Sequence, residues 1–306
     1  MVMLHERRVT VTWAGVEGAE PLEFAYLEDG PADGPLALCL HGFPDHAPTW
    51  TALLGDLAEA GFHAVAPWMR GYAPTAVPVG GLYQPGALSL DAIALADALA
   101  PGDRAAVLVG HDWGALAAYG AVVHRPERFD RLVAMSVPHR ASLTARIVTS
   151  PAQLKRSWYM FFFLVPLAEH AVRFNEFALI DHLWREWSPA YDPPAEYLRG
   201  VKDALGSPGC LDAALSYYRH LLNPFVQDER LAAVEAAGSG WVPVPALYLH
   251  GADDGCIGAD MVSPDDMKLL FPAGLEVEIL PGLGHFLHLE NPAEVNTRIL
   301  RFLTAS

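Results

Sequence analysis

The sequence predicts an α/β fold, in which a mostly parallel sheet is flanked by helices and interrupted by one long helical insertion. Short, continuously apolar runs, which are typical of strands buried on both faces, alternate with helical patterns. Strand patterns stop between residues 141 and 235 and resume afterwards. With 306 residues, of which 52% are hydrophobic, the chain can bury the core that such a sheet needs.

Eight strands are expected along the chain. Alternating apolar residues at 9–13 and 22–26, separated by glycines and a proline, predict an opening antiparallel pair. The remaining strands are predicted at 36–40, 63–68, 107–109, 132–137, 246–250 and 275–280.

Helices are expected between most of these strands. Ser89 can cap a helix that Pro101 and Gly102 stop. The last helix is predicted to open with Asn291 as its cap and Pro292 in its first turn. Further helical patterns lie at 49–60 and near 264–270.

The chain divides into a core and an insertion. Residues 1–140 and 236–306 contain all the strand patterns and are predicted to form the core domain. Residues 141–235, here called the cap, are helical in pattern and rich in aromatic side chains. An aromatic cap favours an apolar substrate, either aryl or long-chain.

Charge and cysteine content exclude several classes of protein. A formal net charge of -16, with no run of Lys and Arg, argues against a nucleic-acid partner. Three cysteines without metal-ligand spacing indicate neither a disulfide framework nor a zinc site. The first residues lack the apolar region of a signal peptide, and the longest apolar stretch, 158–168, is too short to span a bilayer. We therefore expect a cytoplasmic protein that does not bind membranes.

The segment 107–116 has the pattern of a nucleophile elbow that carries Asp112. In such an elbow the nucleophile occupies a strained turn between a strand and a helix, so small residues must flank it. Gly110, Gly114 and Ala115 meet that requirement. No serine in the chain has glycines two residues away on both sides, so a serine elbow is not available. The alternative interpretation is an ordinary surface turn.

Asp254 and His285 complete a candidate triad with Asp112. Each follows a predicted strand, and their order is the nucleophile, acid and base order of α/β-hydrolases. A carboxylate nucleophile attacks an electrophilic carbon and leaves an ester, and a neutral histidine can then activate water to hydrolyse that ester. Asp253 remains the alternative to Asp254, because only one of two adjacent side chains can point at His285.

Two backbone N–H groups are candidates for an oxyanion hole. Trp113 follows the nucleophile, and Phe43 lies in the loop after the 36–40 strand. The tight turn at Pro44 favours a cis peptide bond, the alternative being a proline that only stiffens the loop. His41, His111 and His288 are predicted to be structural rather than catalytic.

The motifs at 41–44, 110–114, 251–254 and 284–285 resemble those of the epoxide hydrolases of the α/β-hydrolase superfamily, and the resemblance covers nearly the whole chain. It implies two cap tyrosines that donate a proton to the epoxide oxygen. Trp158-Tyr159 and Tyr218-Arg219 match their positions. Tyr217 is an alternative to Tyr218, and both tyrosines could instead be part of the cap core. Arg140 stands where the family often has proline, which bears on entry into the cap and not on the triad.

The expected activity is hydrolysis of a small apolar epoxide to a vicinal diol, with water as the second substrate and with no metal or cofactor. Phe43, Trp113, Tyr159 and Tyr218 are expected to contact the substrate. A monomer or a homodimer is compatible with the sequence.

Two rival functions use the same residues differently. A haloalkane or haloacid dehalogenase shares the Asp-His-Asp chemistry, but the family positions that bind halide or a substrate carboxylate hold Phe43, Trp113 and Leu116 here. A non-catalytic receptor with a hydrolase fold is the second rival. The intact triad and both candidate tyrosines argue against it.

Overall fold

The computed structural model describes residues 4–100 and 106–305. One eight-stranded sheet forms its centre, with the order β1-β2-β4-β3-β5-β6-β7-β8. The first two pairings, β1 with β2 and β2 with β4, are antiparallel, and all others are parallel. This confirms the predicted mostly parallel sheet. The strands are β1 (His5–Val11), β2 (Leu22–Asp29), β3 (Leu36–Leu40), β4 (His63–Pro67), β5 (Ala106–His111), β6 (Phe129–Met135), β7 (Ala246–Gly251) and β8 (Leu275–Leu280).

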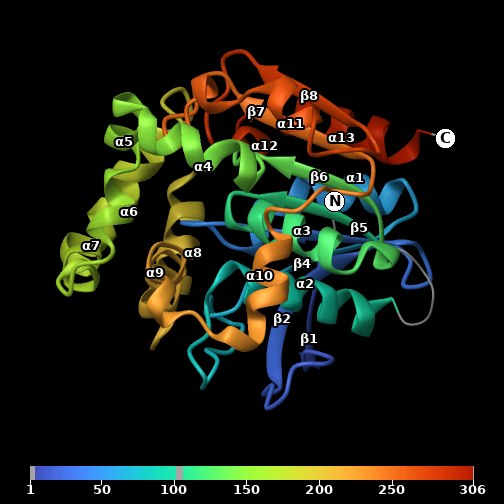
Figure 1. Cartoon of the computed structure of the whole chain (residues 1–306), viewed down its shortest axis with the longest axis horizontal. Helices are drawn as coiled ribbons and strands as arrows, with labels where there is room; N and C mark the ends of the chain where they lie inside the picture. Colours follow the sequence, from blue (N-terminus) through green and yellow to red (C-terminus); the bar gives the residue numbers. More distant parts are fainter. Residues whose placement is uncertain (1–3, 101–105, 306) are drawn as a thin grey trace.

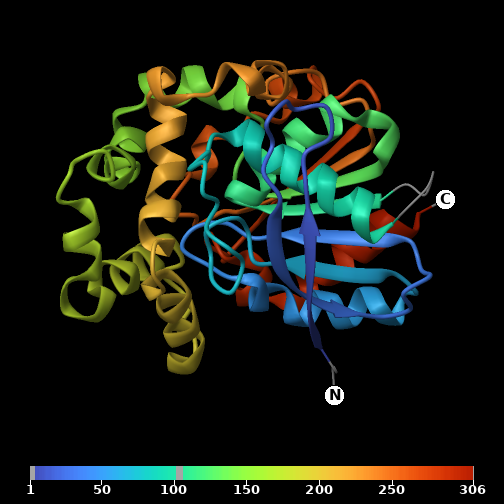
Figure 2. The same ribbon diagram turned by 90° about the horizontal axis from the view of Figure 1, so that it is seen from below.

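Helices cover both faces of the sheet. On one side α1 (Thr51–Glu59) packs against α13 (Pro292–Thr304), and on the other α2 (Pro85–Leu99) packs against α3 (Trp113–His124) (Figure 2). Every residue of β3, β4, β5 and β7 is buried, which explains why these strands are continuously apolar. The shorter helices α11 (Pro264–Lys268) and α12 (Leu287–Glu290) lie in the last part of the chain.

The helical insertion connects β6 to β7. Its middle helices, α5 to α9, gather on one side of the molecule, at the left of Figure 1. Its last helix, α10, packs on α2 and α3 and so returns the chain to the sheet. The insertion consists of α4 (Arg140–Thr149), α5 (Pro151–Arg156), α6 (Trp158–Phe162), α7 (Ala168–Trp187), α8 (Ala195–Gly206), α9 (Cys210–Leu222) and α10 (Ala232–Ala237).

The predicted helix ends are right at one helix and wrong at another. The side chain of Asn291 accepts a hydrogen bond from the Glu294 N–H at 3.3 Å and caps α13, as expected. Ser89 does not cap α2, because this helix begins four residues earlier, at Pro85. Proline suits the first turn of a helix, and the Ser89 hydroxyl instead donates to the Pro85 carbonyl inside the helix. The predicted stop at Pro101 and Gly102 lies outside the described residues.

The carboxyl ends of the parallel strands bring distant segments together. The loops after β3, β5, β7 and β8 carry Phe43, Asp112, Asp254 and His285 respectively, and all four leave the same edge of the sheet. Among the described residues, no helix has both the length and the apolar character needed to cross a membrane.

Candidate active site

Asp112 occupies a strained turn between β5 and α3. Its backbone has φ 52° and ψ -116°, a region that residues other than glycine rarely adopt. The flanking glycines are required by close contacts. A Cβ on Gly110 would collide with the backbone of Gly114, and one on Gly114 would collide with the carbonyl of Leu40. The turn therefore has the geometry of the predicted elbow.

The Asp112 carboxylate is buried, with 6% of the residue exposed. Its Oδ1 accepts a hydrogen bond from the Phe43 N–H at 2.8 Å, and its Oδ2 lies 3.8 Å from His285 Nε2. Burial raises the pKa of Asp112 to about 6, and His285 together with the N–H groups of Phe43 and Trp113 opposes this rise. Both predicted oxyanion donors thus face the candidate nucleophile, which remains mostly ionised at neutral pH.

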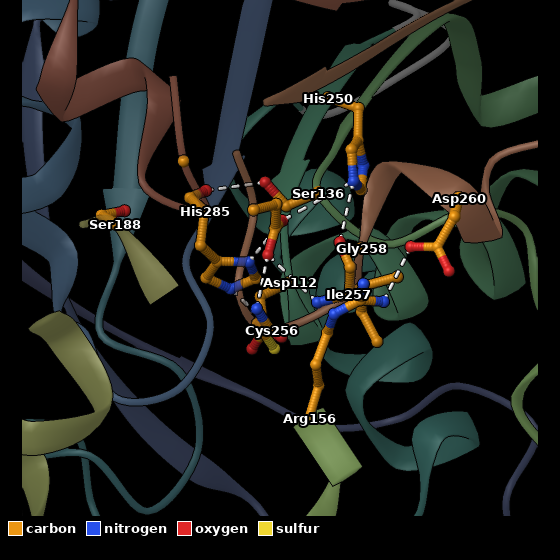
Figure 3. Close-up of polar contacts among 12 residues, drawn as sticks. Asp112, Ser136, Arg156, Ser188, His250, Cys256, Ile257, Gly258, Asp260 and His285 are labelled. Atoms are coloured by element: carbon orange, nitrogen blue, oxygen red, sulfur yellow. Dashed lines mark hydrogen bonds and ion pairs between the residues drawn. The ribbon is translucent and has the colours of Figure 1, made fainter. Parts of the chain in front are cut away.

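His285 is bonded to Asp254 and not to Asp253. Its Nδ1 lies 2.9 Å from Asp254 Oδ2, whereas Asp253 is exposed. The other Asp254 oxygen accepts the N–H groups of Cys256, at 2.7 Å, and Ile257, at 3.0 Å, so the carboxylate is held rigidly. Burial lowers the pKa of His285, but the carboxylates of Asp254 and Asp112 outweigh it and raise that pKa overall. Figure 3 shows His285, Asp112 and Cys256 close together.

The three histidines that were predicted to be structural form hydrogen bonds with residues around the site. His41 Nδ1 lies 2.9 Å from the Gly42 carbonyl, and its Nε2 accepts from the Met69 N–H. His111 Nε2 lies 2.9 Å from the His285 carbonyl and so supports the loop that carries His285. His288 bonds the Thr49 hydroxyl at 2.7 Å and stacks on Trp50. The Phe43-Pro44 peptide bond is cis, as predicted.

Asp112 opens into an apolar cavity of about 390 Å³ between the sheet and the insertion. Tyr159 from α6 and Tyr218 from α9 line it, together with Trp113. Tyr217 does not line the cavity, because its hydroxyl donates to the Arg70 carbonyl at 2.7 Å. A larger hollow of about 700 Å³, along α7 and α8, contains none of the predicted site residues.

The side chain of Phe43 is not part of the cavity lining. It is fully buried, and its ring packs edge-on against Phe163 and Tyr218. Phe43 therefore faces the site through its N–H, while its ring supports the ring of Tyr218. The substrate contact expected of Phe43 stays a prediction, and its N–H is the group that faces Asp112.

Both cavity tyrosines keep their protons at neutral pH. Burial, followed by nearby acidic groups, raises the pKa of Tyr159 and of Tyr218 well above the usual value for a phenol. The Tyr218 hydroxyl is buried and has no hydrogen bond of good geometry to a described residue, although the side chain of Trp113 lies close enough to oppose the rise of its pKa. It is therefore available to a ligand in the cavity.

Arg140 lies at the start of the insertion, where it lines the cavity together with Glu235. The two side chains form an ion pair of 2.7 Å, and the second Glu235 oxygen accepts from the Gly86 N–H. The pair ties α4, α10 and α2 together. Arg140 thus lies where the chain enters the insertion, and its role there stays a prediction.

Among the described residues, two groups of buried side chains each bring three potential metal-ligating atoms within 4.8 Å of one another: Asp112, Cys256 and His285, and Asp45, His111 and His288. In the first group, burial and neighbouring carboxylates raise the pKa of the Cys256 thiol well above its usual value, which opposes metal binding as a thiolate. In the second group, burial lowers the pKa of His288 to about 3 and keeps a neutral ring that could bind an ion.

Two residues at the site escape the sequence patterns. Cys256 lies with its Sγ 3.2 Å from the Tyr159 hydroxyl, and Gln153 from α5 donates to the Cys256 carbonyl at 2.8 Å. The sequence offers one indication that Cys256 lies at the site, because Cys256 stands two residues after Asp254 in the loop of the candidate acid. The sequence offers no such indication for Gln153, since a single glutamine in a helical pattern is usually exposed.

Comparison with known proteins identifies the family of the chain. Residues 37–298 match the profile of the alpha/beta hydrolase family. The chain is 31% identical over 297 residues to an epoxide hydrolase of Caballeronia sordidicola, with 88% of each chain covered. It is 28% identical to epoxide hydrolase 4 of Homo sapiens, over 92% of this chain and 76% of the relative.

Solved structures agree as well. An epoxide hydrolase from Vigna radiata aligns with a TM-score of 0.78 at 26% identity, covering 98% of this chain and 97% of that one. An epoxide hydrolase from Bacillus megaterium aligns with a TM-score of 0.79 at 25% identity, covering 93% and 98% of the two chains. The chain belongs to the alpha/beta hydrolase family and, within it, to the epoxide hydrolases.

Proposed function

We propose that the protein hydrolyses a small, predominantly apolar epoxide to a vicinal diol through an ester on Asp112. One observation carries the proposal. The Asp112 carboxylate opens into an apolar cavity that also receives two protonated phenols, Tyr159 and Tyr218, while His285 stands behind it. A nucleophile, two acids and a base thus surround the space where an epoxide would bind.

In the first step, an Asp112 oxygen attacks an epoxide carbon and the C–O bond of the ring breaks. The leaving oxygen is a strongly basic alkoxide, which takes a proton from Tyr159 or Tyr218 as it forms. A halide ion leaves without such a proton. The two buried phenols therefore favour an epoxide over a haloalkane or a haloacid.

In the second step, His285 removes a proton from water, and the resulting hydroxide attacks the ester carbonyl carbon. Asp254 stabilises the imidazolium that forms. The N–H groups of Phe43 and Trp113 face the carboxylate and can stabilise the oxyanion of the tetrahedral intermediate. On collapse of this intermediate the C–O bond to the diol breaks, the leaving alkoxide takes the proton of the added hydroxyl, and Asp112 is restored as a carboxylate. The imidazolium proton returns to the phenolate through solvent.

We propose that the core and the cap supply different parts of the site. We assign the triad and the oxyanion donors to the core, residues 1–140 and 236–306, and the two phenols to the cap, residues 141–235. The three cysteines are free and buried, which suits a reducing cytoplasm. A monomer or a homodimer is proposed, because the described cavity needs no residue from a second chain.

A single turnover in ¹⁸O-labelled water tests the mechanism. The label should enter the Asp112 carboxylate, and the first diol released should be unlabelled, because its new oxygen comes from Asp112 itself. A panel of aryl and alkyl epoxides, run beside haloalkanes and haloacetates, tests the reaction class. Label in the first diol, or turnover of the halides alone, would overturn the proposal.

A further inference from the structure

A buried thiol lies among the residues that the proposed mechanism uses. The Sγ of Cys256 is 3.2 Å from the Tyr159 hydroxyl, and the residue lines the same cavity as Asp112. Its sulfur also lies within 4.8 Å of ligating atoms of Asp112 and His285. Cys256 is 1% exposed and is therefore in contact with the cavity and not with bulk solvent.

The backbone of Cys256 is held from both sides. Its N–H donates to Asp254 Oδ1 at 2.7 Å, and its carbonyl accepts from Gln153 Nε2 at 2.8 Å. Gln153 is fully buried, and its Oε1 accepts from the Gly258 N–H two residues further along the same loop. The thiol thus has a fixed position relative to the candidate acid and to α5, the helix that precedes Tyr159.

An ion pair between Arg156 and Asp260 extends this hydrogen-bond network to the surface. Arg156 bonds both Gln153 Oε1, at 3.0 Å, and Asp260, at 2.7 Å, beside Gly258 and Ile257 (Figure 3). Because Arg156 and Gln153 belong to α5 and Asp260 follows the Cys256 loop, insertion and core are tied at the point where Tyr159 meets the thiol. The Tyr159–Cys256 contact is therefore part of a fully bonded junction.

We propose that Cys256 is a positioning residue, which donates a hydrogen bond from its S–H to the Tyr159 phenol oxygen while this phenol gives its proton to the epoxide oxygen. The inference rests on the proposed epoxide hydrolysis. The Tyr159 O–H bond breaks, the alkoxide gains the proton, and the thiol keeps its own proton. The phenolate that forms then accepts from the S–H, and hydrogen bonds to a charged acceptor are stronger than those to a neutral one.

The protonation state of the thiol supports this role. Burial, with the charges of Asp254 and Asp112, raises the pKa of Cys256 well above its usual value and outweighs the hydrogen bond with Tyr159, which lowers it, so the thiol keeps its proton at neutral pH. A protonated thiol is also a weak nucleophile, so Cys256 does not compete with Asp112 for the epoxide.

Substitutions at Cys256 test the proposal in single-turnover experiments with an aryl epoxide. Cys256→Ala and Cys256→Val remove the donor, and we expect each to slow alkylation of Asp112 by about threefold to thirtyfold while sparing hydrolysis of the ester. Cys256→Ser keeps a donor and should retain most of the wild-type alkylation rate. Cys210→Ala, which removes a buried thiol outside the cavity, should leave both steps unchanged.

A double-mutant cycle separates this role from plain packing. In a Tyr159→Phe background, the Cys256→Ala change should have little further effect, because the acceptor of the hydrogen bond is gone. The role of the thiol would be overturned if Cys256→Ala alkylated Asp112 at the wild-type rate. It would also be overturned if Cys256→Ala reduced the alkylation rate by the same factor in the wild-type and the Tyr159→Phe backgrounds. If Cys256→Ala does not fold, the same comparison between Cys256→Val and Cys256→Ser decides. A wild-type protein that turns over no epoxide overturns the proposed function, whereas an active wild type with unaffected variants overturns the thiol alone.

Discussion

The ring of His285 stands between two carboxylates, with Nδ1 2.9 Å from Asp254 and Nε2 3.8 Å from Asp112. The shorter contact is a hydrogen bond and the longer one is not. In the neutral ring, Nδ1 therefore carries the proton and donates a hydrogen bond to the Asp254 carboxylate, which leaves the lone pair of Nε2 directed at Asp112. The ring is thus prepared to accept a proton from a water molecule that attacks an ester on Asp112.

Replacing His285 by glutamine should trap the ester. Alkylation needs only the Asp112 carboxylate, whereas hydrolysis needs a base to activate water. Intact-mass spectrometry after mixing with an epoxide, followed by peptide mapping, should place the added mass on Asp112. An unmodified protein, or an adduct on another carboxylate, would contradict the assignment.

Removing the cavity phenols should slow alkylation. We expect Tyr159→Phe or Tyr218→Phe to reduce its rate roughly tenfold to a hundredfold, within the usual contribution of general acid catalysis, and the double variant to lose far more. Hydrolysis of an ester already formed should be largely spared. Pre-steady-state alkylation measures both, with circular dichroism to check folding. Tyr217→Phe is the matched control, because its hydroxyl bonds Arg70 outside the cavity, and it should alkylate at the wild-type rate.

The two chemical steps should depend on pH in different regions. Burial raises the pKa of Asp112 to about 6, so alkylation should fall about tenfold per pH unit below that value, as the nucleophile is protonated. Hydrolysis needs neutral His285. In the free enzyme Asp254 and Asp112 raise the pKa of His285, but the ester removes the Asp112 charge, so we expect hydrolysis to increase with pH as His285 loses its proton and then to level off. Rapid-mix quench across about pH 5 to 9 separates the steps. Alkylation that does not change between about pH 5 and 7 would refute the assignment.

The buried charge of Asp112 should lower the free energy of unfolding at neutral pH. Its folded pKa of about 6 lies above the ordinary value of 3.8, so its contribution to folding is fully present below about pH 4 and is lost as the pH rises through about 6. Asp112→Asn should therefore stabilise the protein by on the order of 1–3 kcal/mol at neutral pH, and much less near pH 4. Urea unfolding at both pH values measures this. Asp253→Asn, at an exposed position, serves as the control. If Asp112→Asn raised the free energy of unfolding equally at both pH values, the burial of the Asp112 charge would not be the cause.

Chelation should leave turnover unchanged. The proposed steps use only side chains, backbone N–H groups and water, although Asp112, Cys256 and His285 could approach an ion. The epoxide hydrolysis rate should be the same before and after dialysis against a chelator. Loss of activity that a divalent ion restores would require a different mechanism.

Much of the fold and part of the site follow from local patterns in the sequence. Strands buried on both faces must be apolar throughout, so the order of strands and helices could be predicted. The Asp112 turn was predictable for a similar reason, because only glycine avoids the collisions at Gly110 and Gly114. Helix ends were less certain. Ser89 is a good capping residue, but the first turn of α2 begins at Pro85.

Only the tertiary structure decided which of two adjacent candidate residues faces the site. Asp253 and Asp254, like Tyr217 and Tyr218, have the same chemistry and adjacent positions, but adjacent side chains point in different directions. The folded chain turns Asp254 toward His285 and leaves Asp253 exposed, and it places Tyr218 in the cavity and Tyr217 against Arg70. The meeting of Cys256 with Tyr159, 97 residues apart, was beyond sequence patterns for the same reason. Local sequence determines the conformation of a segment, whereas contacts between distant segments depend on how the insertion packs on the sheet.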